Sequence, residues 1–155
     1  MVLLIGDGMG YGALDAGRIR TGSLHMEKLP VSGSVLTNDV FGRITDSAAA
    51  GTAFAAGVST YNEAISVGPD SLPVETILEI AEMRGMATGI VATSSVTNAT
   101  PAAFLSHVVD RDNEYEIARQ TVTSGVDILF GGGRLFFNDP ARHDGVDLIS
   151  QFRDQ

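Results

Sequence analysis

The stretch PVETILEIAEMRGMATGIVATSS, residues 73–95, joins a helix pattern directly to a strand pattern. Residues 73–85 have a proline near the first turn, early acidic residues, apolar residues at helical spacing and a final glycine. Residues 87–95 form a short run of apolar and small residues, which is typical of a strand buried on both faces. A helix that leads into a buried strand is a building unit of parallel α/β sheets.

The same alternation continues on both sides of this stretch. Toward the amino end we expect strands at residues 2–6 and 31–38 and helices at 11–20 and 46–57. Toward the carboxyl end we expect helices at residues 100–109, 114–125 and 146–155, and a strand with a glycine turn at 126–133. The sequence therefore predicts an α/β fold with a mainly parallel sheet.

The composition narrows the class of protein. Ten basic against nineteen acidic residues give a net charge of −9 without a basic stripe, so we expect no nucleic-acid partner. The chain has no cysteine, which excludes disulfides and zinc–thiolate sites. No apolar run approaches the roughly 20 residues of a membrane span. The first residues lack the features of a signal peptide, so either the protein stays inside the cell or a leader lies upstream.

The segment IGDGMG places Asp7 between glycines after the expected strand 2–6, at the end where open α/β sheets bind ligands. An ordinary turn aspartate is one interpretation. A dinucleotide fingerprint is another, because Gly8, Gly10 and Ala13 match G-x-G-x-x-A. However, Asp7 would bring a carboxylate to the place of the pyrophosphate, which is repulsive unless a cation lies between them. An anion bound here is therefore expected to come with a metal.

The segment RITDSAAAGTAFAAG, residues 43–57, places Ser47 at the start of a helix of small residues, with Thr45, Asp46 or Ser47 itself as the cap. Such small side chains let a helix pack tightly against a sheet. A hydroxyl in this position lies near free backbone N–H groups and the positive end of the helix dipole. The nucleophile-elbow pattern G-x-S-x-G is absent. Ser47 is therefore either a cap or a nucleophile that another group must activate.

Three histidines are available as a base for Ser47. His25 lies in a connecting segment, His143 in a polar loop, and His107 in an apolar helix pattern that is typical of a satisfied core histidine. A serine that lacks a base needs a metal to lower the pKa of its hydroxyl. Ser47 and Asp7 thus both indicate a cation.

The segment TNATPAAFLSHVVDR, residues 97–111, carries two further candidates. Thr100 precedes Pro101 and is expected to cap a helix or to bind a hard cation. Arg111 is either a solvated surface charge or a planar fork that clamps two phosphate oxygens, and the spacing leaves both interpretations open.

Together, IGDGMG, TDSAAAGTAFAAG followed by TYNEAI, and ATPAAFLSHVVDR resemble the amino-terminal half of the alkaline phosphatase family. VDILFGGG resembles a later strand and glycine turn of that family. The D-S-A block is specific to the family, whereas the glycine turns are not. The resemblance runs in order over nearly the whole chain. It implies a three-layer αβα sandwich with a mainly parallel sheet, of which residues 1–155 would be the amino-terminal part of one catalytic domain, truncated at its carboxyl end.

The resemblance also implies an activity and its site residues: metal-dependent hydrolysis of small phosphate monoesters. Ser47 matches the serine that is phosphorylated and binds metal, and Arg111 matches the arginine that grips the phosphoryl oxygens. Asp7 matches the carboxylate that bridges one zinc and the magnesium, and Thr100 matches a magnesium ligand. Asn98, beside the third metal, departs from the acid or histidine of many members, which leaves open the preference for Mg²⁺ or Zn²⁺ there.

Further expectations follow from this resemblance. The cofactors would be two Zn²⁺ ions and one Mg²⁺ ion, with the remaining ligands in the carboxyl-terminal half of the family. We therefore expect the 155-residue chain alone to bind metal poorly and to turn over little. Members are commonly dimers, and the family implies a periplasmic or extracellular location. The alternatives are a phosphodiesterase, sulfatase or mutase on the same scaffold, or a non-catalytic α/β nucleotide-binding module.

Overall fold

A computed structural model describes residues 1–138, 142 and 144–154. The chain divides into two compact units, residues 1–36 and residues 37–155, and each is described by itself. His143, expected in a polar loop, and Gln155, at the end of the last expected helix, lie outside the described residues.

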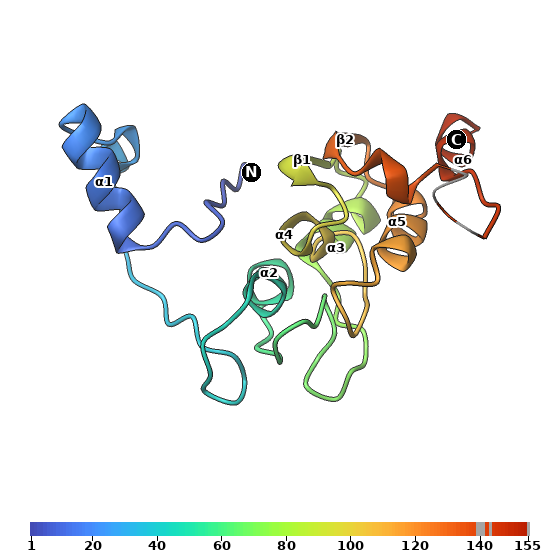
Figure 1. The fold of residues 1–155 in the computed structure, drawn as a ribbon, viewed down its shortest axis with the longest axis horizontal. Helices are drawn as coiled ribbons and strands as arrows, with labels where there is room; N and C mark the ends of the chain where they lie inside the picture. Colours follow the sequence, from blue (N-terminus) through green and yellow to red (C-terminus); the bar gives the residue numbers. More distant parts are fainter. Residues whose placement is uncertain (139–141, 143, 155) are drawn as a thin grey trace. The chain divides into compact units, whose positions relative to one another are not determined.

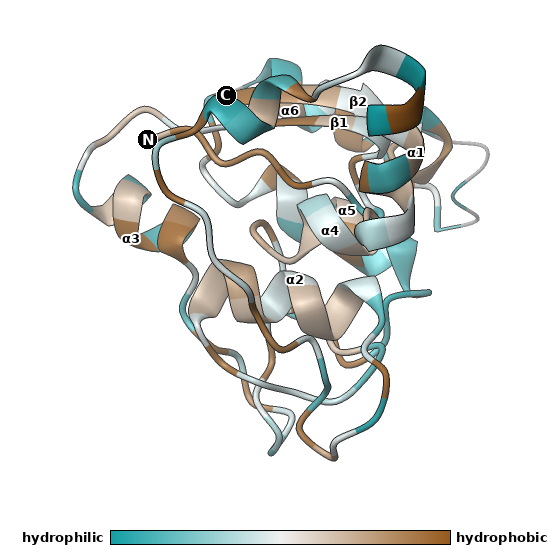
Figure 2. Cartoon of the chain, turned by 90° about the vertical axis from the view of Figure 1, so that its left-hand side faces the viewer, coloured by the Kyte–Doolittle hydropathy of each residue, from teal (hydrophilic) through white to brown (hydrophobic). Residues whose placement is uncertain are grey.

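The first unit contains one α-helix, α1 (Tyr11–Thr21), and one short 3-10 helix, η1 (His25–Lys28). Helix α1 confirms the prediction for residues 11–20. The prediction of a strand at residues 2–6 is wrong here: this segment forms no strand and is largely exposed, although its side chains are hydrophobic (Figure 2). A strand is stabilised by ladder hydrogen bonds to a neighbouring strand, and no other segment of residues 1–36 forms a strand with which residues 2–6 could pair.

The segment 31–38 does not form the expected strand either. Its one ladder contact is an isolated antiparallel bridge between Asn38 and Ile44. The chain turns sharply in between, where Asp39 accepts backbone hydrogen bonds from Phe41 and Arg43. The N–H groups of Phe41 and Arg43 thus bond to the Asp39 side chain, and the residues after the turn form no strand that could extend the bridge into a ladder.

The second unit is built on two parallel strands, which lie side by side in Figure 1. β1 (Gly89–Ser95) pairs with β2 (Ile128–Gly132). The connection runs through helices, as parallel pairing requires, and confirms the predicted α/β class. The predicted burial of residues 87–95 on both faces is wrong: Val91 is 77% exposed, and Phe130 on the neighbouring strand is 66% exposed. Paired strands meet edge to edge, so other elements must cover their faces.

Helices precede, connect and follow the two strands along the chain in the second unit. Helices α2 and α3 precede β1, α4 and α5 connect the two strands, and η2 and α6 follow β2; their bounds are Ser47–Ala56, Ile77–Met83, Ala99–Ala102, Glu114–Val122, Arg134–Phe136 and Leu148–Arg153. Helix α3 begins four residues after Pro73, because Thr76 and Glu79 cap each other's backbone N–H groups in a capping box.

The core of the second unit includes two clusters of buried apolar side chains among the described residues. One joins α2, α4 and α5 through Ala48, Ile65, Ala99, Ala102, Val108 and Ile117. The other joins α5 and α6 through Val96, Ala118, Val122, Phe137 and Leu148. The first cluster lies directly under the amino end of α2 and therefore supports Ser47.

Candidate active site

The amino end of α2 is capped by Asp46, one of the three predicted candidates. Its Oδ1 accepts the backbone N–H of Ala49 at 2.9 Å. Ser47 is the first helical residue and is half-buried. Because Asp46 makes the capping bond, the Ser47 hydroxyl is not needed for it.

Arg111 lies against this helix end. Its Nη1 donates to Ser47 Oγ at 3.1 Å and to Asp46 Oδ2 at 3.2 Å. The Arg111 side chain is only 25% exposed, so the interpretation as a solvated surface charge is wrong. The tertiary structure thus brings together Ser47 and Arg111, two candidates that are 64 residues apart.

A short backbone pairing brings Arg111 to Ser47. Ile65 and Val108 exchange both backbone hydrogen bonds, at 2.8 and 2.9 Å, and further along the Arg111 N–H donates to the Glu63 carbonyl at 2.9 Å. The expected helix 100–109 is therefore much shorter in the structure. Helix α4 ends at Ala102, and the following segment runs beside residues 63–67 instead.

The close packing of α2 on α4 brings the Thr100 segment near Ser47. A Cβ at Gly51 would lie 3.0 Å from Ala103 Cβ and 3.7 Å from Thr100 Cα. The small residues of α2 therefore permit close approach to a helix. The prediction that they pack against the sheet is wrong in this structure. Figure 2 shows the mild hydrophobicity of this alanine-rich helix.

Thr100 does not cap α4, contrary to the prediction. Asn98 is the N-cap, although it makes no side-chain capping bond, and Thr100 is the second helical residue. The helix begins two residues before Pro101, at Ala99. Asn98 and Thr100 are both half-buried.

Asp7 belongs to the first unit. It lies in a glycine turn in which Gly8 has φ +66° and the Gly10 N–H donates to the Gly8 carbonyl at 2.9 Å. α1 begins directly after Gly10. The turn predicted from IGDGMG is thus confirmed, whereas the role of Asp7 as a metal ligand stays a prediction.

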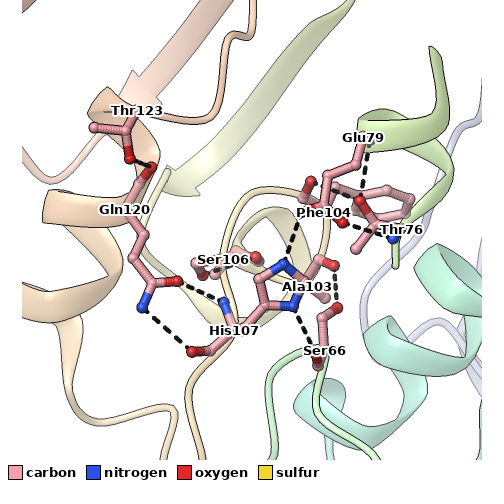
Figure 3. Close-up of polar contacts among 10 residues, drawn as sticks. Ser66, Thr76, Glu79, Ala103, Phe104, Ser106, His107, Gln120 and Thr123 are labelled. Atoms are coloured by element: carbon pink, nitrogen blue, oxygen red, sulfur yellow. Dashed lines mark hydrogen bonds and ion pairs between the residues drawn. The ribbon is translucent and has the colours of Figure 1, made fainter. Parts of the chain in front are cut away.

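His107 lies after α4 and not inside a helix, and its ring is fully engaged (Figure 3). Nδ1 contacts the Ser66 carbonyl at 2.7 Å and Nε2 contacts Glu79 Oε1 at 2.8 Å. Gln120 also accepts the His107 backbone N–H at 2.7 Å. The prediction of a satisfied histidine is confirmed, and these contacts make His107 unavailable as a base for Ser47.

A cavity of about 430 Å³ adjoins this histidine rather than Ser47. Its lining comes mainly from the α3 region and includes Glu79, Met83 and His107, but neither Ser47 nor Arg111. Burial would raise the pKa of the Glu79 carboxyl, but the N–H of Thr76 and the His107 ring outweigh it and hold the pKa below its ordinary value. The Glu79–His107 pair is therefore a structural contact between segments.

The donor set for metal is partial. Among residues 1–138, 142 and 144–154, no three His, Cys, Asp or Glu side chains form a group that could hold a metal ion. The candidates Asp7, Ser47 and Thr100 are oxygen donors, which suit Mg²⁺. Asp7 belongs to the first unit and Ser47 and Thr100 to the second, so the candidates of neither unit reach the three or four protein ligands of a zinc site.

Two residues that contact Asp46 were not predicted from the sequence. Asn62 Oδ1 accepts the Asp46 N–H at 3.0 Å, and the Glu63 N–H donates to Asp46 Oδ2 at 3.0 Å. Both lie in TYNEAI, residues 60–65, a segment that contributes to the family resemblance. The one indication in the sequence is the acid directly before Ser47, whose second oxygen needs partners of its own.

Comparisons with known proteins place the chain in a family. The alkaline phosphatase family model matches residues 1–155. An alkaline phosphatase of Schizosaccharomyces pombe is 38% identical over 99% of this chain and 32% of its own length. Streptomycin-6-phosphate phosphatase of Streptomyces griseus is 41% identical over 86% of this chain and 36% of its own length.

Solved structures agree. A mutant alkaline phosphatase of the Antarctic bacterium TAB5, with Mg bound in its M3 site, has a TM-score of 0.84 and 36% identity, covering 91% of this chain and 41% of that chain. This likeness confirms the predicted alkaline-phosphatase-like α/β fold. The chain spans about a third of the length of the curated relatives that it matches. No helix among the described residues is long and apolar enough to cross a membrane. The chain belongs to the alkaline phosphatase family.

Proposed function

We propose that the protein hydrolyses phosphate monoesters to an alcohol and orthophosphate through a phosphoserine at Ser47. The observation that carries this proposal is the 3.1 Å contact between Arg111 Nη1 and Ser47 Oγ at the amino end of α2. A hydroxyl, a guanidinium and free helix N–H groups together form a site for a tetrahedral anion. The Streptomyces griseus relative is named streptomycin-6-phosphate phosphatase, and this name supports the hydrolysis of a phosphate monoester.

In the proposed reaction, Ser47 Oγ loses its proton and attacks the phosphorus in line. An O–P bond forms, the bond to the ester oxygen breaks, and that oxygen takes up a proton as the alcohol leaves. Water then attacks the phosphoserine, which releases orthophosphate and restores the hydroxyl. The Arg111 guanidinium has five N–H donors and remains cationic, so it binds and orients the phosphoryl oxygens through both steps. Asp46 keeps the guanidinium beside Ser47.

Asp7, Ser47 and Thr100 are the residues of this chain that we propose to hold metal, with Asn98 beside the site. Bound divalent ions supply the charge that lowers the pKa of a hydroxyl or of water. We propose two Zn²⁺ and one Mg²⁺, completed by ligands from elsewhere in the protein. Magnesium in a TAB5 relative supports a metal cofactor. A periplasmic or extracellular location and a dimer remain family-based proposals, as does the assignment of residues 1–155 to one domain.

The test uses the full-length gene product and Ser47→Ala. We expect the variant to lose at least about a thousandfold in kcat and to form no covalent phosphoenzyme after acid quenching, because the attacking oxygen is gone. Ser59→Ala is the matched control, since Ser59 is exposed beyond the end of α2. Labelled phosphoenzyme in Ser47→Ala would contradict the proposal.

The alternatives predict different substrates. Parallel assays of a phosphate monoester, a phosphate diester and a sulfate ester distinguish a phosphatase from a phosphodiesterase or sulfatase. Calorimetric titration with NAD or ATP without divalent metal tests the nucleotide-binding module. Binding heat under that condition would favour the module over the phosphatase.

A further inference from the structure

The side-chain amide of Asn62 forms hydrogen bonds with the backbone of the segment that precedes Ser47. Its Oδ1 accepts the Asp46 N–H and its Nδ2 donates to the Ile44 carbonyl, each at 3.0 Å. Asp46 is thereby held in the extended conformation of an N-cap, with φ −94° and ψ 178°. Asn62 is half-buried and 16 residues from Asp46, so this is a tertiary contact.

The next residue, Glu63, forms backbone hydrogen bonds with both Asp46 and Arg111. The Glu63 N–H donates to Asp46 Oδ2 at 3.0 Å, and the Glu63 carbonyl accepts the Arg111 N–H at 2.9 Å. Glu63 has φ +76°, a left-handed conformation that is uncommon for a residue with a side chain. Residues 62–63 therefore contact both parts of the proposed phosphate clamp: the segment before Ser47 and the backbone of Arg111.

We propose that Asn62 is a positioning residue for the Ser47–Arg111 pair; this inference rests on the proposed function. Asn62 makes no hydrogen bond to either of these two side chains among the described contacts and acts through Asp46. Misplacement of reacting groups by a fraction of an ångström lowers rates, even when the fold is intact. Asn62 thus contributes to the reaction without touching substrate.

Helix α2 has other supports, so loss of the amide is not expected to unfold it. Asp46 Oδ1 still caps Ala49, and Gly51 still packs closely against α4. The consequence of removing the amide should therefore appear in catalysis more than in thermal stability.

The experiment compares Asn62→Ala with the wild type in the full-length protein, well below its melting temperature. We expect kcat/KM for p-nitrophenyl phosphate to fall about tenfold and orthophosphate to inhibit more weakly, because Ser47 and Arg111 lose alignment. Asn113→Ala is the matched control, because Asn113 is exposed and makes no side-chain capping bond at α5. Wild-type kinetics in a folded Asn62→Ala variant would overturn the inference.

A double-mutant cycle separates positioning from general stabilisation. In an Arg111→Ala background, we expect Asn62→Ala to cost less than about twofold more, since the pair that it aligns no longer exists. Fully additive losses would overturn the inference. If Asn62→Ala does not fold, the same cycle is run with Asn62→Asp, which keeps an oxygen toward the Asp46 N–H. Failure of the proposed function differs from failure of the Asn62 inference, because in the first case the wild type itself would not hydrolyse the ester.

Discussion

Arg111 shows at the scale of one residue how neighbours change what a side chain can do. The same arginine in a solvated loop would be a surface charge, but here Asp46 and Ser47 hold one of its nitrogens in place. A guanidinium is planar and can bind two oxygens of a phosphate at once, whereas an ammonium is a point charge. This difference makes the site sensitive to a substitution that preserves charge.

We therefore predict that Arg111→Lys weakens inhibition by orthophosphate about tenfold or more in the full-length protein, because the bidentate contact is lost. The inhibition constant measured in competition with a monoester substrate reports this. Arg84→Lys, at an exposed position, is the control and should behave as the wild type. Equal inhibition constants in Arg111→Lys and wild type would show that the fork is not used.

At the scale of elements, α2 depends on its small residues because it lies close to α4. Gly51 is buried, and a Cβ there would already be as close as 3.0 Å to Ala103 Cβ. Branched side chains at this position must push the two helices apart. Ser47 and Thr100 lie on these two helices, so the spacing matters for the proposed site as well.

We predict that Gly51→Val lowers the free energy of unfolding by about 2 kcal/mol, because overpacking outweighs the gain in helix propensity. Urea denaturation of the full-length protein measures it. Ala53→Val, on an exposed position of the same helix, should cost less than about 1 kcal/mol. Gly51→Val with wild-type or higher stability would show that α4 leaves room for a side chain at this position, because only the gain in helix propensity would then remain.

Helix α3 provides a second prediction, on pH. The folded protein holds the pKa of Glu79 below its ordinary value of about 4.5, against the effect of burial, through the Thr76 N–H and the His107 ring. A lowered folded pKa contributes stability above pH 4.5 that is lost as the pH falls through the folded pKa. Glu79→Gln should therefore flatten the acid side of the stability curve.

Melting temperatures of Glu79→Gln and wild type between pH 3 and pH 7 are the measurement. Glu75→Gln, at an exposed position one residue before the capping box, is the control and should retain the wild-type slope. An unchanged acid slope in Glu79→Gln would show that its contacts with Thr76 and His107 do not stabilise the folded state.

At the scale of the whole molecule, the proposed metal ligands are scattered along the chain. Asp7 lies in one compact unit and Ser47 and Thr100 in the other. Among the residues that the structure describes, no cluster of three typical ligands completes a site. The metals would therefore bind the assembled protein and stabilise it by binding the folded state.

We predict that a chelator abolishes ester hydrolysis by the full-length protein and lowers its melting temperature by several degrees, since ligand binding to the folded state is lost. Zn²⁺ with Mg²⁺ should restore both. Chelator saturated with Zn²⁺ beforehand is the control and should have little effect. Full activity after exhaustive chelation would contradict a role for metal.

Local sequence patterns were sufficient to predict several elements: periodicity, caps and glycines indicated α1, α2, α5 and the two parallel strands. It also indicated Ser47 and Arg111, through a family-specific block and the chemistry of phosphate. Residues 2–6 and 31–38 carry strand-like patterns but form no strands, because a strand depends on a neighbour that local pattern does not specify. Only the tertiary structure revealed that Asp46 contacts Asn62, Glu63 and Arg111, since hydrogen bonds between distant segments leave no periodic trace in the chain.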